Sequence, residues 1–125
     1  MANQGLRGVT HGLIVREPWI TALALGNKIW ELRSKKTSIR GRIGLIRSGS
    51  GLIVATATLR ECLEPLDRKA MFASIDKHQV PRKDIDAAIS AGWCIPWVMT
   101  DVIAFKRPRP YVHPSGAVTW VLLKR

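Results

Sequence analysis

Short runs of apolar residues, separated by glycine, proline and charged residues, recur along the whole chain. This pattern is typical of a small domain built from short strands. Alternation predicts a strand over 29–33, with Trp30 and Leu32 on one face and Ile29, Glu31 and Arg33 on the other. Five further segments rich in β-forming residues are predicted as strands: 12–16, 42–47, 52–59, 97–105 and 117–123.

Three segments between these strands have the composition of helices. The first, 18–25, has Pro18 in its first turn and Gly26 as its left-handed stop. The second covers 64–78, and the third covers 81–91 and ends at Gly92. A Ser-Gly-Ser-Gly sequence over 48–51 predicts a hairpin turn between two of the strands.

These elements predict an α+β fold, with five or six strands in a small barrel and helices packed outside it. The chain of 125 residues contains no repeat and no linker, so we expect a single domain over 1–125. No apolar run approaches the roughly 18 residues of a membrane span, and the N-terminus lacks the apolar core of a signal peptide. We therefore expect a cytoplasmic protein.

Net charge points to the class of partner. Lysine and arginine total 20 against 9 acidic residues, a net charge of +11, which favours polyanions. RNA is a better candidate than duplex DNA, because no recognition-helix pattern appears. A basic surface kept only for solubility is the alternative. The basic residues fall into two groups, one over 28–47 and one of Lys106, Arg107 and Arg109, and the sequence leaves open whether these share a face.

Cysteine and histidine give no sign of a metal site. Cys62 and Cys94 have no CxxC partner, and the three histidines have no ligand spacing. We expect two buried free thiols, no metal and no cofactor.

The stretch 26–33 carries the candidate chemistry. Lys28 lies where a helix gives way to a strand, so a loop can direct its amine into a cleft. Glu31 and Arg33 are two apart on a strand, about 7 Å between Cα atoms, and can hold each other in fixed rotamers. The alternative for Glu31 and Arg33 is a structural ion pair on a solvated strand face, and the alternative for Lys28 is an ordinary surface lysine. Trp19 and Trp30 have the alternative of a place in the core.

Together, Pro18-Trp19, Gly26-x-Lys28-x-x-Glu31-x-Arg33 and Arg40-Gly41-Arg42-Ile43 resemble the activating-signal-cointegrator homology (ASCH) family. The stretch from Pro110 to Val121, with His113-Pro114-Ser115-Gly116, resembles a bacterial subgroup of it. The resemblance implies a barrel like the PUA RNA-binding domain, with a cleft beside it. It implies a cleft lined by Lys28, Glu31 and Arg33, with Trp19 near its wall and with Arg40, Arg42 and Arg47 on a positive rim. His113 and Ser115 are added to the candidates because their side chains are polar and their loop, rich in proline and glycine, has no evident role in the core.

Binding of single-stranded RNA in this basic cleft is the predicted function. The alternative is an enzyme that uses Lys28 and Glu31, because some relatives cleave RNA and others hydrolyse N4-acetylcytidine. The amidohydrolases carry threonine where this chain has Glu31, so their nucleophile is missing here. A protein-binding role, through an exposed tryptophan, is a third possibility.

Overall fold

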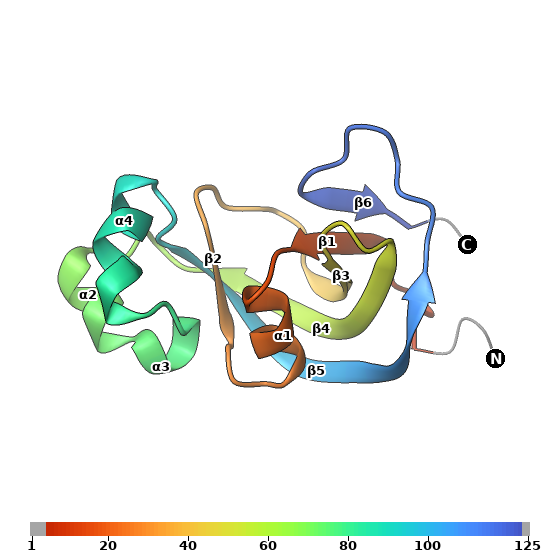
Figure 1. Cartoon of the computed structure of the whole chain (residues 1–125), viewed down its shortest axis with the longest axis horizontal. Helices are drawn as coiled ribbons and strands as arrows, with labels where there is room; N and C mark the ends of the chain where they lie inside the picture. The colour runs from red at the N-terminus through yellow and green to blue at the C-terminus, as the bar shows by residue number, and fades with distance from the viewer. Residues whose placement is uncertain (1–4, 124–125) are drawn as a thin grey trace.

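The computed structural model describes residues 5–123, which form six strands and several short helices (Figure 1). The strands are β1 (His11–Val15), β2 (Trp30–Arg33), β3 (Gly41–Arg47), β4 (Leu52–Cys62), β5 (Ile95–Pro110) and β6 (Trp120–Leu122). The helices are α1 (Trp19–Ala24), α2 (Arg68–Ala73), α3 (Ile75–His78), the 3₁₀ turn η1 (Arg82–Asp84) and α4 (Ile85–Ser90). The α+β class is as predicted.

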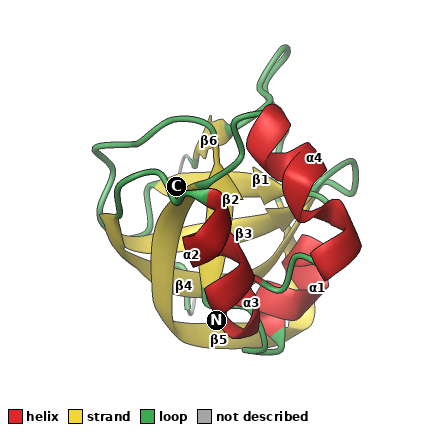
Figure 2. Ribbon diagram, turned by 90° about the vertical axis from the view of Figure 1, so that its left-hand side faces the viewer, coloured by secondary structure: helices red, strands yellow, loops and turns green. Residues whose placement is uncertain are grey.

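All six strands belong to one sheet, in the order β2-β5-β4-β3-β1-β6. β1 and β3 are parallel, with Leu13 opposite Leu45, and every other pair is antiparallel. The sheet curls round on itself into a half-barrel (Figure 2). This confirms the predicted PUA-like barrel.

The main core fills the inside of the curl. Inward side chains of β1, β3, β4 and β5 meet Ile20 and Leu23 of α1, which closes the barrel. Ile20, Leu23, Ile43 and Leu45 are fully buried. A second cluster joins Leu32 of β2 to the helices α2 to α4 and fixes the helical layer against the barrel.

The helix predicted over 64–78 is wrong in both its start and its continuity. It begins at Arg68, because the Asp67 carboxylate accepts a hydrogen bond from the Ala70 amide (2.8 Å) and caps α2. It breaks at Ser74, whose hydroxyl donates back to the carbonyl of Ala70 (2.7 Å) and competes with regular helix geometry. The chain then restarts as α3. The first helix begins at Trp19, one residue after a cis Glu17–Pro18 peptide.

Strand β5 is longer than the predicted 97–105, because irregular pairing lets it continue through two prolines. Its register against β4 shifts at three places, and Asp101 adopts a left-handed conformation (φ 52°). By contrast, β6 is shorter than the predicted 117–123, because Ala117 closes a turn with Pro114 (3.2 Å). Cys62 and Cys94 are free thiols as predicted, but both are partly exposed rather than buried.

Candidate nucleic-acid-binding groove

A groove of about 1330 Å³ runs between the helical layer and the barrel. One wall is α4 with the turn that follows it, and the other is formed by the 111–120 segment and the turn between β3 and β4. The floor is β2 with the end of β1. Five cationic side chains and three carboxylates line it: Arg16, Lys28, Arg33, Lys35 and Lys36, with Glu17, Glu31 and Asp84.

The Lys28 side chain lies in the floor and is 1% exposed, so it is not an ordinary surface lysine. Its Nζ donates to the carbonyl of His78 (2.5 Å) and lies 3.8 Å from Glu31 Oε1 and 4.7 Å from the centre of a Trp19 ring. The pKa of Lys28 is lowered to about 8, mainly by burial; Glu31 opposes the shift and the charge of Arg33 adds to it. Lys28 therefore exchanges a proton close to physiological pH.

Glu31 and Arg33 form the pair that their spacing predicts. Arg33 Nε donates to Glu31 Oε2 (2.9 Å), and Arg33 Nη2 donates to the carbonyl of Ile14 on β1 (2.8 Å). Glu31 is only 5% exposed, so the pair is not on a solvated face. The two hydrogen bonds fix the plane of the guanidinium beside the ring of Trp97, at 5.6 Å.

His78 connects the floor of the groove to the helical layer. Val80 N–H donates to His78 Nδ1 (2.9 Å), so Nε2 carries the proton and donates to the carbonyl of Met71 (2.7 Å). Burial is the main cause that lowers the pKa of His78, and nearby Lys28 adds to it. The neutral ring holds the end of α3 in place, and that end presents its carbonyl to Lys28.

Aromatic side chains form much of the walls. Trp97 of β5 and Trp120 of β6 stack at 5.8 Å with nearly parallel rings, and Trp93 on the opposite wall is 52% exposed. On the 111–119 loop, Tyr111 donates its hydroxyl to His113 Nδ1 (2.7 Å), and His113 Nε2 donates to Ala117 (2.9 Å). Burial raises the pKa of Tyr111.

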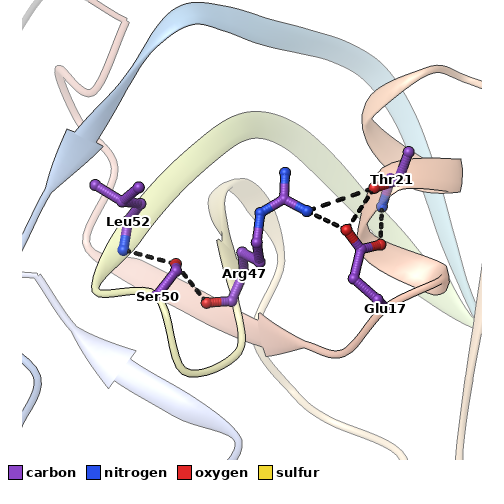
Figure 3. A network of polar contacts seen from close by, with 5 residues as sticks. All are labelled: Glu17, Thr21, Arg47, Ser50 and Leu52. Atoms are coloured by element: carbon purple, nitrogen blue, oxygen red, sulfur yellow. Dashed lines mark hydrogen bonds and ion pairs between the residues drawn. The ribbon is translucent and has the colours of Figure 1, made fainter.

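A polar network at the edge of the groove joins α1 to the β3–β4 turn (Figure 3). Arg47 pairs with Glu17 and lies 3.4 Å from the hydroxyl of Thr21, which itself donates to Glu17 (2.7 Å). These bonds from Thr21, with the charge of Arg47, lower the pKa of Glu17. Ser50 then bridges the carbonyl of Arg47 and the amide of Leu52, closing the turn.

The structure brings five of the nine candidate residues into the groove: Trp19, Lys28, Glu31, Arg33 and His113. Arg47 does not line the groove itself but pairs with Glu17, which does. Arg40, Arg42 and Ser115 do not line it. The Arg42 guanidinium instead donates to Thr56, Thr58 and the carbonyl of Asp101, where it braces β3, β4 and β5. The expected positive rim is therefore confined to Arg47.

Several lining residues were missed from the sequence: Arg16, Lys35, Lys36, Trp93, Trp97, Tyr111 and Trp120. Lys35 and Lys36 directly follow Arg33, so the charge run itself was a usable signal. The tryptophans come from β5, β6 and the α4–β5 turn, and only the curl of the sheet brings them to one groove.

The profile of the ASCH domain matches residues 13–109. The chain belongs to the ASCH family. No protein of curated function matches it. The matched residues include the floor of the groove with Lys28, Glu31 and Arg33.

Solved ASCH structures share the fold at low sequence identity. A crystal structure of ASCH from Zymomonas mobilis superposes with a TM-score of 0.71 at 11% identity, covering 92% of this chain and 87% of that one. A tyrosine-to-phenylalanine mutant of the same protein gives 0.70 at 12% identity, covering 92% and 90%. A serine-to-alanine mutant gives 0.67 at 11%, covering 92% and 88%. Within residues 5–123, no helix is long and apolar enough to cross a membrane.

Proposed function

We propose that this ASCH domain binds single-stranded RNA, with an unstacked base in the groove and phosphates on the exposed cationic side chains that line it. One observation carries the proposal: aromatic side chains line the same groove as the Arg33 guanidinium, which two hydrogen bonds hold in place at the floor. Single strands can splay their bases onto aromatic rings, whereas bases within a duplex stay stacked on one another. The net charge of +11 supports a polyanionic ligand.

Arg33 has the donor that such a ligand needs. Two of its nitrogens are used by Glu31 and Ile14, while Nη1 makes no hydrogen bond to any residue over 5–123. Because no buried side-chain nitrogen or oxygen among the described residues lacks a partner, Nη1 is not sealed from solvent, and Arg33 itself lines the groove. Its N–H groups are held in a fixed plane for a phosphate or a base carbonyl.

The test is a fluorescence-anisotropy titration with labelled single-stranded RNA, single-stranded DNA and duplex DNA at two salt concentrations. We expect RNA to bind best, with log affinity falling against log salt by about 0.7 for each phosphate contacted. Arg33→Ala is expected to weaken RNA binding by about 1–3 kcal/mol, the usual range for a specific arginine contact.

Arg60→Ala is the matched control, because Arg60 is an exposed arginine of β4 that does not line the groove. It removes the same charge without touching the site. Equal weakening by the two variants would mean that net charge alone drives binding, and the groove proposal would fail. Melting temperatures of both variants establish that the loss is not a loss of fold.

A second candidate is hydrolysis of RNA or of an N4-acylated cytosine, favoured by the pKa of about 8 at Lys28 beside Glu31. In this scheme the Glu31 carboxylate takes a proton from the attacking hydroxyl or water, and the Lys28 ammonium protonates the leaving group. The bound RNA is run on a denaturing gel, and N4-acetylcytidine is incubated with the protein and analysed by chromatography. Turnover that Lys28→Ala abolishes would support an enzyme; unchanged substrates would leave a binding module.

A further inference from the structure

The second basic group of the sequence, Lys106, Arg107 and Arg109, does not line the groove. These residues lie in the last part of β5, which turns upward on the side of the molecule away from α2, α3 and α4 (Figure 1). The proposed binding of a base in the groove therefore leaves them without a role.

The pairing of β5 with β4 is interrupted where these residues lie. Arg109 is opposite Ile53 and Ala104 is opposite Ala55, so the four residues 105–108 face the single residue Val54. A bulge of this size turns side chains out of the ladder. Lys106 and Arg107 are accordingly exposed, and neither side chain makes a hydrogen bond or ion pair with another residue in the described part of the chain.

A turn near the N-terminus adds a further cation to this bulge. Leu6 is buried in one cluster with Phe105, and exposed Arg7 follows Leu6 on the same turn. The guanidinium of Arg109 lies over the Phe105 ring at 4.6 Å. The sequence has no acidic residue before Glu17 or after Asp101. The surface formed by Arg7, Lys106, Arg107 and Arg109, here called the β5 arm, therefore gathers cations from segments that contain no carboxylate side chain.

The β5 arm leads to the groove. Tyr111 lines the groove and directly follows Pro110, the last residue of β5. At about 3.3 Å per residue, the five steps from Lys106 to Tyr111 span at most about 17 Å. A single strand that leaves the groove at Tyr111 can thus continue along the arm.

We propose that the β5 arm is a second contact surface for the RNA, which binds the sugar–phosphate backbone beyond the base held in the groove. This inference rests on the proposed function. Its contacts are to phosphate rather than to bases, because Phe105, the aromatic ring of the arm, is covered by Arg109. Contacts of this kind add affinity without adding sequence preference.

A competing explanation is protection of a sheet edge. Beyond Val98, β5 is paired on one side alone within the described sheet, and charged residues with bulges commonly prevent such edges from pairing with another chain. That explanation predicts self-association once the charges are removed, with no change in RNA affinity. The two accounts therefore differ in a measurable way.

The experiment compares labelled single-stranded RNAs of about 6 and about 20 nucleotides, lengths that bracket the site sizes of small single-strand-binding folds. The variant is Lys106→Ala/Arg107→Ala. The matched control is Arg60→Ala/Lys69→Ala, which also removes one arginine and one lysine, both exposed and outside the groove. We expect the unmodified protein to bind the longer RNA roughly tenfold more tightly than the shorter one.

We expect the Lys106/Arg107 variant to lose that length advantage and about 1.4 units of salt slope, while the control and the short RNA remain unaffected. Equal affinity for both lengths, or an unchanged advantage in the variant, would overturn the β5 arm and leave the groove intact. Self-association of the variant with unchanged RNA binding would establish edge protection instead. Failure of both RNAs to bind would overturn the proposed function and this inference with it.

Discussion

At the scale of single residues, Lys28 has the most unusual environment in the described chain. Its spacing from Glu31 was visible in the sequence, but its burial was not, because burial depends on the end of α3 and on Trp19 closing over it. The result is a lysine whose pKa of about 8 lies below the ordinary 10.5. Burial is the principal cause.

This pKa predicts a pH dependence of stability. Between about pH 8 and pH 10.5 the unfolded chain binds more protons at Lys28 than the folded one, so the free energy of unfolding rises with pH in that window. From about pH 7.5 to about pH 9.5 the gain is roughly 2 kcal/mol. Urea unfolding of the native protein and of Lys28→Met, which removes the titrating amine, isolates this contribution.

The comparison stays below pH 10 because burial raises the pKa of Tyr111, whose ionisation would favour the unfolded chain at higher pH. Other lysines titrate in both proteins and cancel in the difference. Identical slopes of stability against pH in the two proteins would contradict the burial of Lys28.

Trp93 gives a second prediction at this scale. It is the most exposed aromatic side chain of the groove walls, at 52%. We expect Trp93→Ala to weaken RNA binding by about 1–3 kcal/mol, the range for base stacking, with no change in salt slope. Trp93→Phe, which keeps an aromatic face, is expected to retain most of the affinity. A reduced salt slope in Trp93→Ala would argue against stacking as its role.

At the scale of elements, short polar side chains decide where the helices begin and break. Asp67 caps α2, and Ser74 separates α2 from α3 so that His78 reaches the floor of the groove. The 3.6-residue pattern of apolar positions over 64–78 could not reveal this, because both pieces bury the same side of the chain. Local hydrogen bonds overrode the pattern.

The cap of α2 predicts a modest stability effect. Asp67→Ala is expected to lower the free energy of unfolding by about 1 kcal/mol, because the Ala70 amide loses its partner. Asp67→Asn keeps a capping oxygen and is expected to lose much less. Chemical denaturation measures both. Equal losses in the two variants would assign the effect to charge rather than to capping.

At the scale of the whole molecule, the class, the strand count and the three residues of the floor could be predicted from the sequence. The alternation over 29–33 and the Gly-x-Lys-x-x-Glu-x-Arg spacing carried that information locally. The structural role of Arg42 could not be predicted from the sequence. Its guanidinium donates to Thr56, Thr58 and the carbonyl of Asp101, which come together only when β3, β4 and β5 pair. The clustering of arginines along the sequence therefore predicted more residues on the positive rim than the structure places there.

The walls of the groove depend on the curl of the sheet into a half-barrel. β6 reaches β1 only at the far end of the strand order, and this places Trp120 on Trp97. Likewise, the bulge at 105–108 follows from a mismatch of register between two long strands. Such features depend on pairing between distant segments, which a one-dimensional pattern does not encode.

The central claim is that RNA occupies the groove, and photo-crosslinking tests it most directly. A single-stranded RNA containing 4-thiouridine is bound, irradiated and digested, and the crosslinked peptides are identified by mass spectrometry. We expect crosslinks on peptides that contain Trp93, Tyr111 or Trp120, competed by unlabelled RNA and reduced in Arg33→Ala. Crosslinks confined to peptides outside the groove, such as the one with Arg60, would contradict the account.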